Sequence, residues 1–330
     1  MPSILTHYLF GLDATNNIKN LEIYQSIKKY RHIYFFGLQG PDPMYYHAPL
    51  KKENYYDIAY TLHNKNTGNF IKSLLEFYTT LDKSSQMAQC CLAYICGFIG
   101  HYVLDFSTHP YIYYIGGNYD KNDPKTDIYM GLHNRIELAI DSILIQEKYK
   151  VPSHLFKIHK HILKLDSLPP CVLDMFKYSM KMVFDIEEGD KILDNSYKSM
   201  KLYYKLTFDR LGFKKKLYSV ASPCFSIRLA SQMRTLSYYE CEKEYIDYLN
   251  LNKSVWFHPV TGTLHTHSFY DLMKDGHKVM TQLMADLDDF NKGQLSFWEM
   301  ADKIPDLSYC TALPECKNQE MSYFKIISEA

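Results

Sequence analysis

Apolar residues recur at every third or fourth position along most of this chain, which is the spacing of helices with one buried face. In the segment 127–149, for example, Leu132, Ile136 and Ile140 are each four positions apart. The same kind of spacing predicts helices over 14–36, 69–81, 170–185, 190–209, 225–250 and 267–289. Alternation with a period of two is scarce, so we expect no convincing β-sheet. The pattern therefore predicts an all-α, multi-helix bundle.

The most apolar stretch runs from 88 to 106, and a serine at 84 or 85 could cap the helix that contains it. His101 and Asp105 interrupt this stretch before it reaches the roughly 20 residues that a membrane span requires. Ionisable groups are costly in lipid, so we expect a buried helix and no transmembrane segment.

Residues 37–47 and 114–127 are predicted to be loops because of their Gly, Pro and Asn content. A boundary is expected near residues 250–264. We therefore divide the chain into an all-α domain over 1–250 and a helical C-terminal extension over 251–330, which is expected to pack on the same domain.

The charge of the chain is balanced, with 37 basic and 37 acidic residues, which argues against a general binder of polyanions. The only dense basic run, FKKK at 213–216, is better explained as a solvated helix face, so there is no strong nucleic-acid signal. The eight cysteines show no CxxC spacing and are expected to be free thiols in a reducing compartment. The N-terminus lacks the features of a signal peptide, and we expect a cytoplasmic protein.

Two histidine–carboxylate pairs carry the most specific chemistry. His101 and Asp105 are four residues apart, as are His133 and Glu137, so each pair projects from one face of a helix. Imidazole and carboxylate are the ligands that Zn²⁺ takes where thiolate is absent, and facing helical pairs recur as metal sites in all-α proteins. The alternative is a purely structural pairing of each histidine with its own carboxylate, since a buried charge needs a partner.

Four further residues could join these pairs. Pro110 should end or kink the helix before it, which would leave His109 at a corner, free to lean away from the face of the first pair. Asp42 lies between two prolines on a rigid turn, which suits a ligand of fixed orientation. His7 and His63 are the remaining upstream candidates.

In chain order, the segments THYLFG, GPDP, LHN, GHYVLDFSTHP and HNRIE resemble the zinc-dependent phospholipase C family, whose fold is shared with secreted trinuclear zinc nucleases. The family pattern is an N-terminal His, an Asp in a loop, a His, an HxxxD pair, a nearby His and a final HxxxE or HxxxD pair. By motif, the resemblance covers roughly residues 2–150. It implies an all-α fold, two or three Zn²⁺ ions and hydrolysis of a phosphodiester.

The resemblance also implies a ligand set for each ion. The first zinc ion would be held by Asp42, His63, His101 and Asp105. The second, in a more open site, would be held by His109, His133 and Glu137. The third would be bridged by Asp105 and would also take His7.

Two of these ligand assignments do not follow directly from the family pattern. His63 is preferred to the nearby His47 because of its place in the order of motifs. In the family, the amine and carbonyl of a terminal Trp chelate the third ion. Here, removal of Met1 would leave Pro2 to supply both groups.

The resemblance gives Asp42 a second role as general base on the attacking water. A phospholipid is the favoured substrate among small phosphodiesters, and it would bring peripheral contact with a membrane. An apolar rim for the lipid could come from Tyr45, Tyr46, Phe106, Tyr111 and Tyr113. A single-strand nuclease, a hydrolase of a soluble phosphoester and a non-catalytic metal-binding protein are the alternatives.

Overall fold

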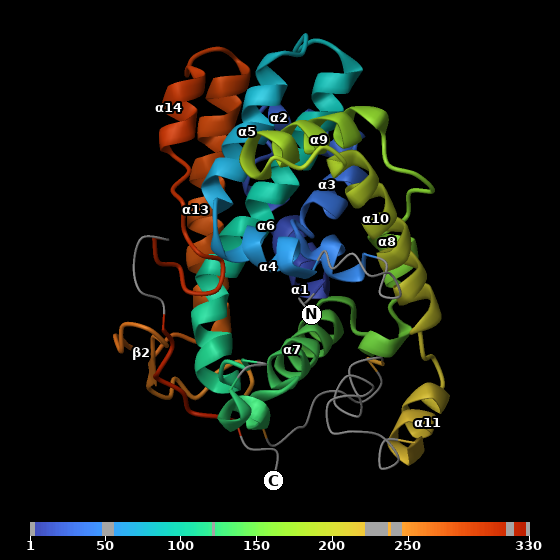
Figure 1. Ribbon diagram of the computed structural model, residues 1–330, viewed down its shortest axis with the longest axis vertical. Helices are drawn as coiled ribbons and strands as arrows, with labels where there is room; N and C mark the ends of the chain where they lie inside the picture. The colour runs from blue at the N-terminus through green and yellow to red at the C-terminus, as the bar shows by residue number, and fades with distance from the viewer. Residues whose placement is uncertain are drawn as a thin grey trace.

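The computed structural model describes residues 4–47, 56–120, 123–221, 237–238, 246–314 and 320–327. Helices dominate these residues, and the two strands between them are two residues long each. The predicted all-α class is therefore confirmed. Several of the other helices pack around α6, the long helix near the centre of Figure 1.

The α-helices are α1 (Ile4–Asn17), α2 (Ile23–Lys29), α3 (Arg31–Gly37), α4 (Tyr56–Asn64), α5 (Thr67–Thr79), α6 (Gln86–Gly116), α7 (Leu132–Tyr149), α8 (Ile158–His161), α9 (Pro170–Phe184), α10 (Gly189–Leu206), α11 (Phe213–Ala221), α13 (Phe269–Asn291) and α14 (Phe297–Asp302). Short 3-10 helices are η1 (Asp42–Tyr46), η2 (Pro124–Tyr129) and η3 (Ser153–Leu155). Strands β1 (Trp256–Phe257) and β2 (Leu264–His265) pair antiparallel.

The helix α6 forms the centre of the core. Its first turn is capped by Ser85, whose side-chain oxygen accepts a hydrogen bond from the N–H of Ala88 at 3.1 Å, as the sequence predicts. By length and composition α6 could cross a membrane, but 89% of its most apolar stretch is buried inside the protein. It packs against α1, α2, α3, α5, α7, α9 and α13. Within this structure α6 is therefore a core helix.

Glycines allow α3 to cross α6 at close range. A Cβ atom at Gly97 would lie 2.3 Å from the carbonyl oxygen of Tyr34, and one at Gly37 would lie 2.4 Å from the carbonyl oxygen of Tyr94. A larger residue at either position would push the two backbones apart. The close contact brings the turn that follows α3 against the polar side chains of α6.

Some element boundaries differ from those predicted. The expected helix over 14–36 is three helices, because α1 starts earlier and ends at Asn17, and Tyr30 leaves helical geometry between α2 and α3. Asparagine side chains near 17–20 compete for backbone hydrogen bonds and favour the break between α1 and α2. The expected loop at 114–127 is shorter, since α6 reaches Gly116 and η2 begins at Pro124. The helix predicted over 225–250 lies mostly outside the described residues.

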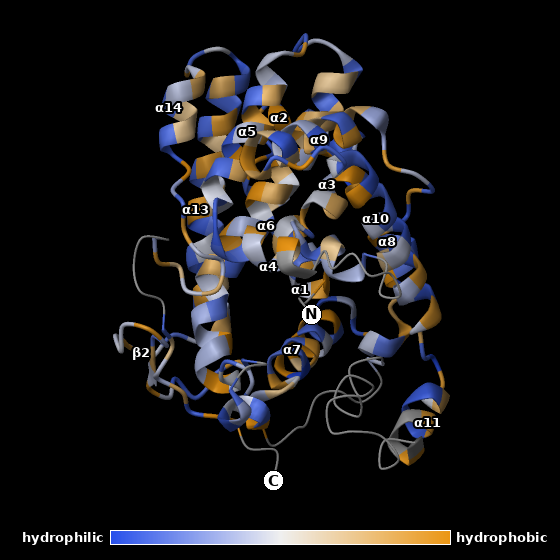
Figure 2. Cartoon of the chain, viewed as in Figure 1, coloured by the Kyte–Doolittle hydropathy of each residue, from blue (hydrophilic) through white to orange (hydrophobic). Residues whose placement is uncertain are grey.

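The C-terminal part of the chain packs against the same core. Helix α13 lies against α6 and α1, and α14 lies against α5. Figure 2 shows both hydrophobic and hydrophilic residues along α13 and α14, as expected for helices that bury one face. The hairpin of β1 and β2 interrupts the helical character that we expected after residue 250. The division into a domain and an extension stays a prediction.

Candidate metal centre

Three ionisable side chains interrupt the apolar surface of α6 at four-residue spacing: His101, Asp105 and His109, all buried. The Nε2 atom of His101 lies 3.0 Å from Oδ2 of Asp105, and Nδ1 of His109 lies 3.7 Å from the same oxygen. The helix does not end at Pro110, because packing on all sides supports it to Gly116. The prediction that the helix ends at Pro110 is therefore wrong, although Nε2 of His109 still faces Glu137 rather than Asp105, at 3.2 Å.

Two N-terminal elements bring further candidate ligands to this face. Helix α1 carries His7, whose Nε2 atom lies 3.1 Å from Oδ1 of Asp105 and whose ring stacks on His101 at 4.2 Å between centroids. The 3-10 helix η1 carries Asp42, and α4 carries His63 near its end. The Nε2 atom of His63 lies 2.9 Å from Oδ1 of Asp42. Both of these side chains are buried.

The turn before Asp42 can approach α6 only because it contains Gly40. This residue has a φ of +47°, and a Cβ atom there would lie 2.3 Å from the ring of His101. A substitution would be strained and would also displace the imidazole. The carbonyl of Leu38, in the same turn, accepts a hydrogen bond from Nδ1 of His101 at 3.2 Å. The turn therefore holds both Asp42 and the ring that faces it.

Helix α7 supplies the last pair. The Nε2 atom of His133 lies 3.1 Å from Oε1 of Glu137, and Nε2 of His109 lies 3.2 Å from the same oxygen. The side chain of His133 is 24% exposed, whereas that of Glu137 is 6% exposed. Solvent therefore reaches this part of the centre from the side of His133.

All eight residues singled out in the sequence thus lie in one cluster. Their ligand atoms form three groups, each with atoms within 4.8 Å of one another, and the first two groups share a residue: His7, His101 and Asp105; Asp42, His63 and His101; His109, His133 and Glu137. Asp105 turns Oδ1 toward His7 and Oδ2 toward His101, which is the orientation that a bridging carboxylate needs. His101 belongs to two of the groups.

Three of the histidines share a hydrogen-bond arrangement that suits metal ligation. In each, Nδ1 lies within hydrogen-bond distance of a backbone carbonyl: His63 with Ala59 at 2.7 Å, His101 with Leu38 at 3.2 Å, and His109 with Tyr309 at 3.1 Å. A carbonyl can only accept, so Nδ1 must carry the proton, and Nε2 faces the cluster. This is the tautomer and orientation found in metal-binding histidines.

Unsatisfied polar atoms also indicate a cation. Nε2 of His101 and Oδ2 of Asp105 lie 3.0 Å apart but form no hydrogen bond, because the ring proton of His101 is on Nδ1. Oε2 of Glu137 is also buried without a hydrogen-bond partner. A cavity of about 10 Å³ lies between the side chains of His7, Asp105, His109 and Glu137. That is about the volume that one water or one ion needs. The donor set, the tautomers and the space therefore fit Zn²⁺ ions held by nitrogen and oxygen.

A family model described as zinc dependent phospholipase C matches residues 6–186, which is more than half of the 330 residues and includes all eight clustered side chains. The chain belongs to the zinc-dependent phospholipase C family. No curated protein and no solved structure matches the chain. Family membership and the positioned histidines and carboxylates together support a zinc phospholipase-like hydrolase.

The electrostatics of this phospholipase C-like centre favour a bound cation. Burial alone would raise the pKa of Asp105 and of Glu137, but the facing histidines outweigh it and lower both, so the two carboxylates are ionised. Burial lowers the pKa of His101 and of His133, which favours the neutral, ligating imidazole. Burial opposes protonation of His109 too, yet Asp105 and Glu137 raise its pKa to about 9. A proton therefore occupies His109 where a metal would bind.

Some of the predicted residues lie elsewhere. His47 directs Nδ1 to the hydroxyl of Ser196 at 3.1 Å and belongs to none of the three groups.

Tyr46 and Tyr111 are buried and cannot form a rim for lipid. Tyr45 and Tyr113 are half-buried, with ring centroids 5.4 Å from His63 and 4.8 Å from His133 respectively. Phe106 is half-buried, packed edge-on against Tyr102. Pro2 lies outside the described residues.

Sequence reasoning missed Asp141, a fully buried carboxylate one turn beyond Glu137 on α7. It accepts hydrogen bonds from the N–H of Leu5 at 3.2 Å, from the N–H of Thr6 at 2.8 Å and from the Thr6 hydroxyl at 2.7 Å. The hydroxyl of Tyr238 donates a fourth at 2.9 Å. Asp141 therefore joins the first turn of α1, just before His7, to α7. An acid in an apolar helix segment is the signal that could have found it.

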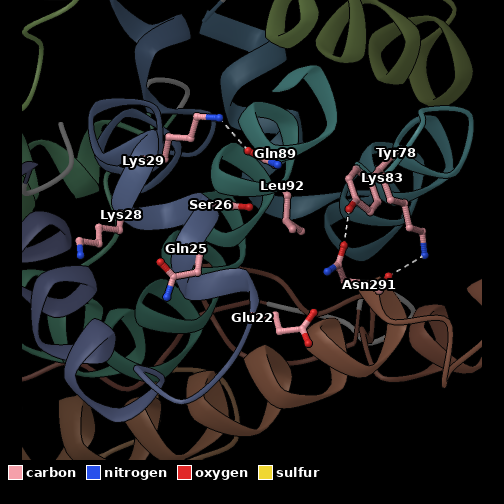
Figure 3. A pocket seen from close by; sticks show the side chains of 10 residues that line it. All are labelled: Glu22, Gln25, Ser26, Lys28, Lys29, Tyr78, Lys83, Gln89, Leu92 and Asn291. Atoms are coloured by element: carbon pink, nitrogen blue, oxygen red, sulfur yellow. Dashed lines mark hydrogen bonds between the residues drawn. The ribbon is translucent and has the colours of Figure 1, made fainter. Parts of the chain in front are cut away.

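A second hollow lies away from this centre. It has a volume of about 690 Å³. Figure 3 shows its lining residues, which come mainly from α2, the start of α6 and the end of α13. Two of its three lysines have partners within the protein, since Lys29 donates to Gln89 and Lys83 donates to the carbonyls of Phe290 and Asn291. No histidine or cysteine is among its ten lining residues. The hollow therefore offers no alternative to the metal centre.

Proposed function

We propose that this protein hydrolyses the phosphodiester bond between glycerol and the phosphorylated headgroup of a phospholipid, using Zn²⁺ held by the eight clustered residues. The observation that carries the proposal is the convergence of all eight family positions, from α1, η1, α4, α6 and α7, on one buried cluster. In the reaction, the oxygen of water bonds to phosphorus, the bond from phosphorus to the glycerol oxygen breaks, and that oxygen takes a proton. The products are diacylglycerol and a phosphorylated headgroup.

Bound zinc lowers the pKa of water and stabilises negative charge on the phosphate oxygens. The protein supplies the geometry and a proton acceptor. Asp42 is 1% exposed, and its Oδ1 atom faces His63 while Oδ2 lies 3.9 Å from Nδ1 of His101. We assign Asp42 the role of general base that accepts the proton of the attacking water. The opening beside His133 is the entry for the phosphate, because the other clustered side chains are buried.

Helix α11 supports a lipid substrate. Phe213, Leu217 and Val220 share one face of this helix and are 64 to 76% exposed, and Leu211 just before it is 66% exposed. Three consecutive lysines, at 214–216, lie in the same helix. Figure 1 shows α11 at the periphery, apart from the central helices. An exposed apolar face with neighbouring lysines is typical of helices that lie in the interface of an anionic membrane.

The test is a hydrolysis assay on phosphatidylcholine vesicles, a nitrophenyl phosphodiester and single-stranded DNA, each with and without a chelator. We expect chelator-sensitive release of the headgroup from phosphatidylcholine. Asp42→Asn should lower kcat by about 10²-fold or more, since general-base catalysis contributes that much. The control Asp302→Asn, at an exposed position of α14, should leave kcat unchanged.

The proposal is wrong if the zinc-loaded protein cleaves only the soluble ester or only the DNA. It is also wrong if chelator has no effect on turnover. A variant at Asp42 that keeps its zinc and full activity would remove the assigned role of this residue alone.

A further inference from the structure

The residues that follow α14 reach the metal centre although they lie far beyond the family match at 6–186. The N–H of Tyr309 donates to the carbonyl of His63 at 2.9 Å. The carbonyl of Tyr309 accepts from Nδ1 of His109 at 3.1 Å. One peptide segment therefore connects a candidate ligand on α4 with a candidate ligand on α6.

The side chain of Tyr309 closes the same wall of the centre. Its ring is 1% exposed and lies with its centroid 5.3 Å from that of His63 and 5.6 Å from that of His101. Tyr102, one position after His101, packs against it as well, at 5.3 Å. Three of the clustered histidines thus contact this single residue.

The segment around Tyr309 is a closed loop, here called the 307–314 loop. Leu307 and Pro314 form an isolated antiparallel bridge, and the N–H of Ser308 donates to the carbonyl of Leu313 at 2.9 Å. Ala312 turns the chain with a φ of +56°. Because its ends are joined, the loop presents Tyr309 in one fixed conformation.

Contacts with α5 and α6 hold the 307–314 loop in place. Just before it, Asp306 accepts hydrogen bonds from the N–H groups of Gly68 at 2.7 Å and Asn69 at 3.0 Å, in the first turn of α5. The hydroxyl of Thr67 donates to the carbonyl of Leu307 at 2.7 Å, and that of Tyr102 donates to the carbonyl of Pro305 at 2.6 Å. The anchor is therefore separate from the clustered ligands.

We propose that the 307–314 loop is a structural part of the zinc centre, in which Tyr309 positions His109 through its carbonyl and the rings of His63 and His101 through its side chain. The carbonyls that orient His63 and His101 come from Ala59 and Leu38, inside the family match. The one that orients His109 comes from 200 positions further along the chain. Hydrogen bonds of this kind fix the tautomer and the direction of Nε2, and their loss typically costs 10- to 100-fold in metal affinity.

The inference rests on zinc occupying the cluster, as the proposed function requires, but it does not depend on the substrate. Its test therefore measures metal binding in the full-length protein. The affinity for Zn²⁺ is obtained by competition with a chromogenic chelator, and Co²⁺ in place of Zn²⁺ reports ligand geometry through its visible absorption. If the wild-type protein binds no zinc, the proposed function and this inference both fail, whereas wild-type zinc affinity in the loop variants overturns the inference alone.

Tyr309→Ala keeps the carbonyl that faces His109 but removes the ring that packs on His63 and His101, so it should weaken Zn²⁺ binding and change the Co²⁺ spectrum. Tyr309→Phe keeps the ring and the backbone, so it should restore both to wild-type values. Asp306→Ala, which loosens the loop at an anchor remote from the ligands, should weaken zinc binding in the same direction even if Tyr309→Ala fails to fold. The matched control is Trp298→Ala, which removes an aromatic side chain that is 75% exposed on α14.

A purely structural loop would give a different result. Tyr309→Ala and Asp306→Ala would then lower the stability of the metal-free protein, while zinc affinity and the Co²⁺ spectrum of the folded variants stayed at wild-type values. That outcome overturns the proposal. Equal weakening by Trp298→Ala would also overturn it, because the effect would then not be specific to the 307–314 loop.

Discussion

Replacement of Asp141 tests how α1 is held against α7 and hence how His7 reaches the metal centre. This carboxylate is fully buried and accepts hydrogen bonds from two backbone N–H groups of the first turn of α1 and from the hydroxyls of Thr6 and Tyr238. First-turn N–H groups have no partner within their helix, and they carry the positive end of its dipole. A negative charge at this position therefore stabilises α1 in two ways.

The magnitude follows from the donors that Asp141→Ala would leave behind. The hydroxyls of Thr6 and Tyr238 can rotate, but the N–H groups of Leu5 and Thr6 are fixed by the helix. Each buried donor left unsatisfied costs about 1–3 kcal/mol, so the pair costs roughly 2–6 kcal/mol. We expect a loss of about 4 kcal/mol, a large part of the 5–15 kcal/mol that a typical domain has. Asp141→Asn, which keeps one acceptor oxygen, should lose about half as much.

A matched control exists on the same two helices. Asp13 of α1 and Lys148 of α7 form an ion pair at 2.5 Å, with side chains that are 39% and 42% exposed. Such an exposed pair contributes about 0–1 kcal/mol, so Asp13→Ala should be nearly neutral. Both changes remove a carboxylate that joins α1 to α7, and they differ in burial.

The assay is urea unfolding of the metal-free proteins, followed by circular dichroism, together with the zinc content after reloading. Asp141→Asn should bind less zinc than wild type because His7 directly follows the loosened turn, whereas Asp13→Ala should bind the same amount. Should Asp141→Ala and Asp13→Ala differ by less than about 1 kcal/mol, the reasoning about buried donors is refuted. If Asp141→Asn is destabilised but keeps its zinc content, Asp141 contributes to stability without being needed to position His7.

Two further predictions concern protons and lipid. Because the pKa of His109 in the metal-free protein is raised to about 9, zinc binding near pH 7.5 should release a proton from it, and this release should vanish above pH 9; calorimetry in buffers of different ionisation enthalpy measures it. The raised pKa of His109 also stabilises the metal-free fold. This stabilisation is complete below the unfolded-state pKa of about 6.5 and is lost as the pH rises through 9, so the urea midpoint of the metal-free protein should fall between about pH 6.5 and pH 9. The double variant Phe213→Glu and Leu217→Glu should bind anionic vesicles at least tenfold more weakly in a sedimentation assay, with its zinc content unchanged. Vesicle binding equal to that of the wild type would exclude α11 as the membrane contact.

The sequence was sufficient for features that depend on local spacing. Four-residue spacing places His101 with Asp105 and His133 with Glu137 on single helix faces, and the structure has both pairs on helices. The same rule applies to His109, four residues after Asp105, yet the proline that follows it led us to expect a change of direction. Proline removes one hydrogen bond, and the packing around α6 outweighs that loss.

Contacts between distant segments could not be predicted in this way. The carbonyls of Leu38 and Tyr309 that orient His101 and His109 are backbone groups, and every residue has one, so no side-chain pattern marks them. The approach of Leu38 depends on glycines at the crossing of α3 and α6. The break between α2 and α3 could not be predicted either, because the apolar spacing continues across it and both helices pack on α6.

The sequence left open whether the histidines and carboxylates pair only with one another, and the geometry of the metal-free cluster bears on this. Simple structural pairs would join each histidine to its own carboxylate and satisfy the buried atoms. His101 and His133 do lie 3.0 and 3.1 Å from their own carboxylates, Asp105 and Glu137. Each carboxylate also faces a second histidine, however: His7 of α1 faces Asp105, and His109 of α6 faces Glu137. Oδ2 of Asp105 and Oε2 of Glu137 are nevertheless buried without a hydrogen-bond partner, at a cost of about 1–3 kcal/mol each. A divalent cation among these atoms would remove that cost, whereas structural pairing leaves it unexplained.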